Sequence, residues 1–339
     1  MTVNRTVLQE RLINIVKRFS QRRMLVVGDA IADQFVYGAI SRVSREAPVF
    51  ILRHEHTETV PGGAANCAVN LASLGARVSL VSVAGKDEAG KALIERLNSA
   101  GVDCSGVVIA DDVRTTTKVR ILAGQVHSTR QQVIRLDYDN DVLNTQTLRA
   151  QVQERVRDHV GAADAIIVSD YNYGIADTTM ISLVREAASR QKIPLLADSR
   201  FKLSEFASFT SATPNEDEVE QLLAKRLATT ADLETAGTRL RDRLGFRALL
   251  VTRGGHGITL LEDGVDPLHI EAVGSSEPVD VTGAGDTVMA TYALALASEA
   301  SFPDAARLAN YAGGIVVMKR GTAAVTCEEL ENSLAGSQE

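Results

Sequence analysis

Cysteine is scarce in this chain. Only Cys67, Cys104 and Cys327 occur in 339 residues. They are odd in number, widely spaced and without the paired spacing of a zinc site, so the sequence indicates neither a disulfide framework nor a cysteine metal site. Free thiols of this kind are usual where the cell keeps cysteine reduced. We therefore expect a cytoplasmic protein.

A long hydrophobic run is also missing. No segment approaches the roughly 20 consecutive apolar residues that a transmembrane helix requires. The N-terminus through Arg23 is charged and has no continuous apolar segment of the kind found in export signals. Hydrophobic residues nevertheless make up 45% of the chain, which is enough for a full core. The sequence predicts a soluble protein that is not exported and has no membrane partner.

Positive charge is in deficit. Lysine and arginine number 36 against 43 aspartates and glutamates, which gives a net charge of -7. This balance argues against nucleic acid or an anionic membrane as the main partner. A small phosphorylated ligand needs only local positive charge and is compatible with this composition.

Several common catalytic motifs are absent as well. The sequence contains no Walker P-loop, no Gly-x-Ser-x-Gly nucleophile elbow and no cluster of histidine and cysteine with metal-ligand spacing. Residues 62–66 read Gly-Gly-Ala-Ala-Asn, which lacks the spacing of a dinucleotide-binding fingerprint. Any phosphate site must therefore be built in another way.

Apolar runs typical of buried strands alternate with helical patterns, which predicts an α/β fold with a mostly parallel sheet flanked by helices. We predict strands at 24–27, 78–84, 102–109, 165–170, 193–198 and 247–252, and helices at 6–19, 67–75, 89–100, 148–160, 180–189 and 302–317. Two β-rich stretches interrupt this rhythm, at about 35–60 and 107–137, and the second contains paired strands around the polar loop 124–130. Together they predict a small antiparallel lid.

The segment Gly283-Ala284-Gly285-Asp286 holds the chemistry that is easiest to recognise. We read Val279–Val281 as a strand and the residues from Asp286 as an apolar helix, so the glycines lie at a helix N-terminus. Backbone N–H groups there lack partners within the helix and bind anions. A carboxylate beside them is placed to take a proton from an attacking hydroxyl. The alternative is that Asp286 only stabilises the helix dipole.

Two earlier segments offer groups for a sugar. Asp29 and Asp33 follow a predicted strand, and Asp33 is placed to bind sugar hydroxyls. Gly62 and Gly63 precede a helix that contains Asn66, whose amide both donates and accepts hydrogen bonds. The alternatives are turn or cap duty for the aspartates and close helix packing for the glycines.

A proline-led helix start at 213–220 is crowded with carboxylates. Asn215 and Glu218 are three residues apart and share a helix face, so they fit a hydrated Mg²⁺ beside phosphates. Favourable charge at a helix N-terminus is the alternative explanation. In the predicted lid, Lys118, Arg120 and Arg135 are candidates to bind an anionic group, although solvated strand faces often carry such residues.

In this order, the strand-end aspartate, the Gly-Gly segment with Asn66, the Asn-x-x-Glu helix start and Gly-Ala-Gly-Asp resemble the ribokinase-like, or PfkB, family of sugar kinases. The resemblance covers nearly the whole chain. It implies ATP and Mg²⁺ as cofactors, Asp286 as the base and a homodimer joined through the lid. It also implies one kinase domain over residues 1–339, without the nucleotidyltransferase domain that often follows the kinase domain in heptose 7-phosphate kinases.

The resemblance implies roles for the remaining residues too. The anion hole would be formed by Gly283, Ala284 and Gly285. The sugar would be bound by Asp33, Gly62, Gly63, Asn66 and Asp170, with Lys118, Arg120 and Arg135 at its far end. The nucleotide would lie near Asn215, Glu216, Asp217, Glu218, Thr252, Arg253, Gly254, Gly257 and Asn310, with Glu218 on the metal through water.

Within the family, the segments 27–29, 41–49, 132–137 and 169–171 resemble the kinases that phosphorylate O1 of D-glycero-β-D-manno-heptose 7-phosphate for the lipopolysaccharide core. The alternatives are a PfkB kinase of ribose, fructose phosphate or a nucleoside, and a sugar-binding regulator without turnover. The chain departs from the family pattern in three places, one of which is a longer loop at 124–130. Asn172-Tyr173 stands where we expect Ala-Lys, and Ser199-Arg200 stands where we expect Pro-Lys.

Overall fold

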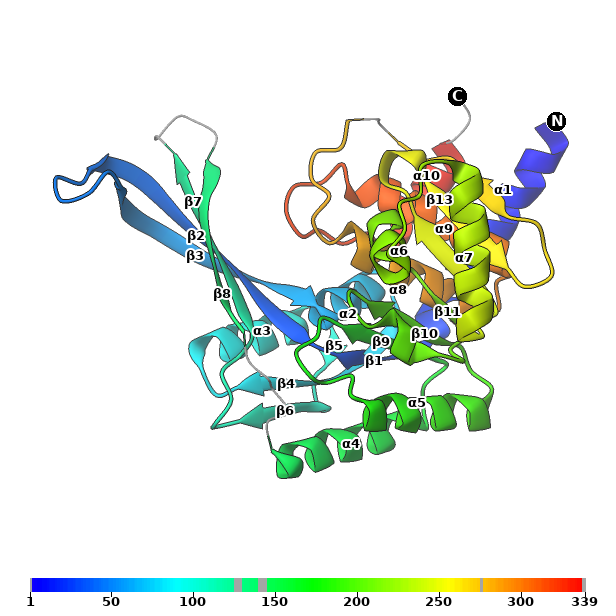
Figure 1. Cartoon of the computed structure of the whole chain (residues 1–339), viewed down its shortest axis with the longest axis horizontal. Coiled ribbons are helices and arrows are strands. Elements are labelled where there is room, and N and C mark those ends of the chain that lie inside the picture. Colours follow the sequence, from blue (N-terminus) through cyan, green and yellow to red (C-terminus); the bar gives the residue numbers. More distant parts are fainter. Residues whose placement is uncertain (1, 125–129, 140–144, 275–276, 337–339) are drawn as a thin grey trace.

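Two β-sheets organise the chain (Figure 1). The computed structural model describes residues 2–124, 130–139, 145–274 and 277–336. Along the large sheet the strand order is β14-β13-β12-β11-β10-β9-β1-β4-β5, and β6 also pairs with β4. Its strands are β1 (Arg23–Gly28), β4 (Arg77–Gly85), β5 (Val102–Asp103), β6 (Val107–Ala110), β9 (Ala165–Asp170), β10 (Leu195–Ser199), β11 (Ser211–Ala212), β12 (Ala248–Thr252), β13 (Ile258–Glu262) and β14 (Leu268–Ile270). All pairs are parallel except β12 with β13 and β13 with β14.

Helices cover both faces of the large sheet. They are α1 (Thr2–Val16), α2 (Ala64–Ser73), α3 (Glu88–Ser99), α4 (Gln146–Val160), α5 (Thr178–Gln191), α6 (Glu216–Leu223), α7 (Thr230–Leu244), α8 (Ala284–Ala297), α9 (Phe302–Val316) and α10 (Cys327–Gly336), with short 3₁₀ turns at Phe19–Gln21, Leu203–Phe206 and Gly254–His256. Among the described residues, none of these helices is both long and apolar enough to cross a lipid bilayer.

Strand β1 shows how the two faces are separated. Met24 and Val26 belong to one hydrophobic cluster, together with α1, α2, α3, α8, α9 and α10, whereas Leu25 and Val27 belong to the other, together with α4, α5, α6 and α7. A strand buried on both sides reads as a continuous apolar run, which is the pattern in the sequence. The predicted α/β class with a mostly parallel sheet flanked by helices is therefore confirmed.

The small sheet projects from the large one (Figure 1). We call it the lid sheet. Its strands, in spatial order, are β3 (Phe50–Gly63), β2 (Ala30–Val43), β7 (Thr117–Gly124) and β8 (Gln131–Tyr138). The outer pairs are antiparallel, as predicted, and the central pair of β2 with β7 is parallel. Of the polar loop predicted between β7 and β8, residues 125–129 lie outside the described residues.

The predicted bounds of the lid need correction. The first two lid strands reach inward to Ala30 and Gly63, so they lead directly into the large sheet and α2. Val107–Ala110 does not belong to the lid, because it pairs with Ser82–Gly85 of β4 in the large sheet. The single strand predicted at 102–109 is also wrong. A turn closed by the Val107 N–H and the Cys104 carbonyl, 2.9 Å apart, divides it into β5 and β6.

The strand predicted at Val279–Val281 is wrong as well. The N–H groups of Val279 and Asp280 both donate to the carbonyl of Val317, at 2.8 and 3.1 Å, so this segment pairs with the chain after α9 and joins no sheet. The structure also adds β11, β14, α7 and α10, for which no element was predicted. The carboxyl ends of β1, β9, β10 and β12 lie at one edge of the sheet, where ligands of open α/β sheets bind.

Candidate active site

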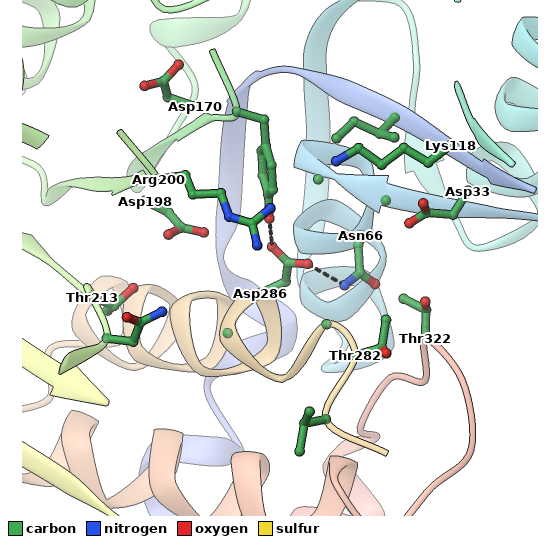
Figure 2. A pocket seen from close by; sticks show the side chains of 18 of the residues that line it. Asp33, Asn66, Lys118, Asp170, Asp198, Arg200, Thr213, Thr282, Asp286 and Thr322 are labelled. Atoms are coloured by element: carbon green, nitrogen blue, oxygen red, sulfur yellow. Dashed lines mark hydrogen bonds between the residues drawn. The ribbon is translucent and has the colours of Figure 1, made fainter. Parts of the chain in front are cut away.

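A polar cavity of about 320 Å³ lies at this edge of the large sheet, below the base of the lid sheet (Figure 2). Its walls come from strand ends, from the first turns of helices and from β7. Charged and amide side chains dominate the lining. They are Asp33, Asn66, Lys118, Arg120, Asp170, Asp198, Arg200, Asn215, Glu218 and Asp286. The structure therefore gathers residues that are far apart in the sequence around one space.

Asp286 lies in the first turn of α8 and is only 6% exposed. Asn66 Nδ2 donates to its Oδ2 at 2.6 Å, and Tyr171 Oη donates to its Oδ1 at 3.0 Å (dashed in Figure 2). Burial raises the pKa of Asp286 to about 6, while these two hydrogen bonds act in the opposite direction. The carboxylate is therefore ionised at neutral pH and basic enough to accept a proton, as a general base requires.

The N-terminus of α8 has room for an anion beside Asp286. A Cβ added to Gly285 would meet no atom within 4 Å, so the backbone is open to a ligand there. Gly283 caps the helix with a left-handed φ of 76°. The Ala284 N–H already donates to the Val281 carbonyl at 3.2 Å, which corrects the predicted anion hole. Its candidate donors are therefore the amides of Gly283 and Gly285.

A buried hydrogen-bond network fixes α8 against α2. Asn70 Nδ2 donates to both the carbonyl and the side-chain oxygen of Asn66, at 3.0 and 3.2 Å. Thr287 Oγ1 donates to Asn70 Oδ1 at 2.8 Å. The side-chain amide of Asn66, which is predicted to contact the sugar, therefore also orients Asp286. Its nitrogen donates to Asp286, while its oxygen accepts from Asn70. Buried networks with every member satisfied are rigid.

The base of the lid sheet forms the other wall of the polar cavity. Asp33 and Arg120 form an ion pair there, and Gly62 and Gly63 line the same wall. A Cβ on Gly62 would lie 2.4 Å from Asp33 Oδ2, so only glycine leaves room for this carboxylate. Lys118 lines the cavity too, and burial lowers its pKa.

Arg135 lies on the same side of the lid sheet but not at the cavity. It is the direct cross-strand neighbour of Arg120. Its guanidinium donates to both carboxylate oxygens of Asp137, at 2.8 and 2.6 Å, and it is not among the residues that line the cavity. Arg135 therefore lies outside the cavity lining, and its predicted contact with a sugar phosphate stays a prediction.

An apolar cavity of about 290 Å³ adjoins the polar one. The two cavities share Thr252, Val281 and Gly285. The remaining lining of the apolar cavity consists mostly of glycines and aliphatic residues, namely Gly254, Gly255, Gly257, Ile258, Ala272, Val273, Pro278, Ala284, Val288, Asn310, Gly313, Gly314 and Val317. A mostly apolar pocket with few polar groups suits a flat heterocycle. The predicted nucleotide residues Thr252, Gly254, Gly257 and Asn310 all lie here.

Of the predicted nucleotide residues at the start of α6, only Asn215 and Glu218 line the polar cavity. Asn215 and Glu218 also form a reciprocal capping box, while their role at a magnesium ion stays a prediction. Glu216 instead accepts from Arg253 Nε at 2.7 Å. Neither member of this ion pair lines the polar or the apolar cavity, and neither does Asp217, so their predicted position at the nucleotide stays a prediction.

The carboxylates of the polar cavity fit a hydrated Mg²⁺. Glu218 and Asp198 both line it, and burial raises the pKa of each side chain, for Asp198 well above the usual range. Within the described residues, no three histidine, cysteine or acidic side chains converge closely enough to hold a metal ion. Mg²⁺ commonly keeps several waters and binds proteins through one or two carboxylates plus phosphate oxygens, and this donor set matches that habit.

Three residues at the site received no role from the sequence. Tyr171 donates a hydrogen bond to Asp286, and Asp198 and Arg200 line the polar cavity. All three follow or end strands whose last residues the sequence pattern did identify. Asp170 was predicted and lies there as well. Its carboxylate accepts from Ser199 Oγ at 2.7 Å and from the Asn172 N–H at 3.0 Å.

Comparisons with known proteins give a consistent result. Residues 21–329 match the sequence profile described as pfkB family carbohydrate kinase. The chain is 42% identical over 324 residues to the Bifunctional protein HldE of Pseudomonas aeruginosa strain LESB58, and 39% identical to that of Photobacterium profundum. Both matches cover 95% of this chain and 65% of the relative's length.

Solved structures show the same fold. Arabidopsis thaliana ribokinase, in complex with ribose and ATP, superposes with a TM-score of 0.72 at 22% identity and covers 92% of this chain and 98% of its own. Escherichia coli phosphofructokinase-2, in complex with potassium, gives a TM-score of 0.75 at 20% identity, with 93% and 98% covered.

Proposed function

Because the chain belongs to the PfkB family of carbohydrate kinases, a group of phosphotransferases that act on sugar hydroxyls, we propose that its acceptor is O1 of D-glycero-β-D-manno-heptose 7-phosphate. The phosphoryl donor in this proposal is ATP and the product is the 1,7-bisphosphate. One observation carries the proposal. A buried carboxylate with a raised pKa, Asp286, stands beside the place where a polar cavity lined by cations meets an apolar one.

The reaction follows from this arrangement. The sugar lies in the polar cavity and the adenine in the apolar cavity, so the γ-phosphate lies near Gly285, which lines both. The sugar O1 attacks the γ-phosphorus, its proton passes to Asp286, and the bond to the β–γ bridging oxygen breaks to release ADP. The positive end of α8 stabilises the charge on the transferred group. Mg²⁺, held near Glu218, would neutralise charge on the donor phosphates.

The cations of the polar cavity support a phosphorylated acceptor. Lys118, Arg120 and Arg200 all line it. Arg120 is paired with Asp33, whereas Lys118 lies 5.7 Å and 5.8 Å from the ring centres of Tyr171 and Tyr173. A cation flanked by aromatic rings keeps its charge in a partly buried place and offers it to an anion. The sequence resemblance at residues 41–49 and 132–137 selects heptose 7-phosphate among phosphorylated sugars.

The experiment is a coupled ADP-release assay on a set of acceptors. Heptose 7-phosphate is compared with the unphosphorylated heptose, ribose, fructose 6-phosphate and a nucleoside. We expect kcat/KM for heptose 7-phosphate to exceed that of the unphosphorylated heptose by roughly ten- to hundred-fold, the value of one charge-assisted hydrogen bond. Equal values would replace this proposal with a kinase of free sugars. No turnover on any acceptor would favour the sugar-binding regulator.

A pair of variants tests which cation binds the phosphate. Lys118→Met should raise KM for the sugar phosphate by about ten-fold or more while KM for ATP changes little, because the lost contact belongs to one substrate. Arg135→Met is the matched control, since it removes a cation of the lid sheet that is already held by Asp137. A larger KM change in the control than in Lys118→Met would place the phosphate at Arg135 instead.

A further inference from the structure

We propose that Tyr171 is a positioning residue that fixes the orientation of Asp286 and keeps it ionised at the pH of catalysis. The inference rests on the proposed function, in which Asp286 is the base. Its starting point is the hydrogen bond from Tyr171 Oη to Asp286 Oδ1, 3.0 Å long. With Asn66 on Oδ2, each carboxylate oxygen holds one donor and keeps one lone pair for the acceptor hydroxyl.

The loop that carries Tyr171 is itself clamped. Asp29, which is 2% exposed at the end of β1, accepts from the N–H groups of Tyr171 and Tyr173 at 2.8 and 3.0 Å, and from that of Ile175 at 3.2 Å. Asn172 adopts a left-handed φ of 65° between them. A buried carboxylate that collects three backbone donors leaves a loop little freedom. A rigid segment therefore holds the Tyr171 hydroxyl in position to donate to Asp286.

The phenol remains a donor throughout the working range. Burial, and next the negative charge of Asp286, raise the pKa of Tyr171 well above its usual value. The groups that influence the charge of Asp286 lie on several elements. Asn66, Tyr171 and Arg200 favour its ionised form and Asp33 opposes it, while burial and next the charge of Asp286 raise the pKa of the nearby Asp198. Removing one donor therefore shifts the balance toward the protonated carboxyl.

A purely structural role makes a different prediction. If the ring of Tyr171 only fills space, Tyr171→Phe preserves it, and the pH at which activity falls should not move. If the hydroxyl sustains the charge of Asp286, its loss raises the pKa of the base. The acid limb of kcat/KM then moves to higher pH by about one to two units, the equivalent of one hydrogen bond to a charged group.

The test is the pH profile of kcat/KM for the parent and three variants. Tyr173→Phe is the matched control, because its hydroxyl donates to Asp139 at 2.8 Å and not to the base. We expect Tyr171→Phe to shift the acid limb upward and Tyr173→Phe to leave it in place. An unshifted limb in Tyr171→Phe overturns the inference while the proposed function stands. Asp286→Asn tests the proposed function itself, because an active Asp286→Asn variant would exclude Asp286 as the base.

A second measurement does not depend on activity. In protein labelled with ¹³C at aspartate carboxyl groups, the Asp286 resonance is identified by its loss in Asp286→Asn. Its titration midpoint should rise in Tyr171→Phe and stay in Tyr173→Phe. Equal midpoints in all three proteins would refute the inference even if the Tyr171 variant turned over too slowly for kinetics.

Discussion

The surroundings of Asp286 determine how basic its carboxylate is. The carboxylate of an aspartate in water has a pKa of about 4 and is therefore a weak base. Burial in the first turn of α8 raises its pKa to about 6, and the bonds from Asn66 and Tyr171 keep the ionised form available. A buried carboxylate of this kind is more basic than a free one and still charged at neutral pH, which is the compromise that proton transfer demands.

Asp286→Asn should therefore abolish turnover while the protein folds normally. We expect kcat to fall by roughly 10²- to 10⁴-fold, the usual contribution of a general base. The parent should lose activity as the pH falls through about 6, because protonated Asp286 cannot accept the proton of the acceptor. Kinetics from pH 5 to 8, with ATP affinity measured separately, check both statements. Turnover within a few-fold of the parent would exclude Asp286 as the base.

The sequence predicted those site residues whose residue type and position at the start of a helix both indicate a binding or catalytic role. Asp286 and Glu218 stand in first turns of helices, and Asn66 follows a Gly-Gly helix entry, so each was selected before its surroundings were known. Tyr171 and Arg200 could not be selected in this way. Their places at the cavity depend on loop paths that are fixed by partners distant in sequence. Asp29 accepts from the N–H of Tyr171, and the Arg200 N–H donates to the Asp170 carbonyl.

The start of α8 offers a matched pair of glycines. Gly283 has a left-handed φ of 76°, and a Cβ there would lie 2.7 Å from Asn66 Nδ2. Gly285 is within the helix, with open space around its Cα. Both glycines are close to Asp286 in the sequence, but only at position 283 do the backbone conformation and the packing require glycine.

We predict opposite effects on stability for the two alanine variants. Gly283→Ala should lower the free energy of unfolding by at least about 1 kcal/mol, the cost of a non-glycine residue in the left-handed region. Gly285→Ala should raise it by up to about 1 kcal/mol, since alanine favours the helix, yet activity should fall because the new methyl group occupies the anion's approach. Urea unfolding and kinetics on both proteins test this. Equal destabilisation would contradict the geometry described at this helix start.

Long elements were easier to predict than short ones. Buried strands such as β1 and β9 have continuous apolar runs, and their sheet was predicted correctly. β11 has only two residues, and β5 also has two, so neither leaves a periodic pattern. Val279–Val281 has the composition of a strand but joins no sheet, because the N–H groups of Val279 and Asp280 donate to the carbonyl of Val317. Only tertiary structure reveals such a partner.

Within the described residues, no further strand pairs with either edge of the lid sheet. β3 and β8 are its outer strands, and Ile134, 50% exposed on β8, is one of several exposed apolar residues there. Long exposed edges with apolar side chains promote association unless they are covered. This supports the homodimer inferred from the family resemblance, joined lid to lid.

We predict a dimer at micromolar concentration and a monomer after Ile134→Asp. The matched control is Val265→Asp, which replaces an equally conspicuous apolar residue, 58% exposed, between β13 and β14 and outside the lid sheet. Multi-angle light scattering distinguishes the two states. A parent that is monomeric, or a control that dissociates as readily as the lid variant, would contradict association through the lid.

The two adjoining cavities divide the chain into separate stretches. Every residue that lines the apolar cavity falls between Thr252 and Val317, whereas the lid wall and the cations of the polar cavity come from the first 200 residues. In the proposed function, acceptor choice and donor use would therefore depend on different parts of the chain. Substitutions within the first 200 residues would change the sugar that is accepted while the nucleotide cavity keeps its lining.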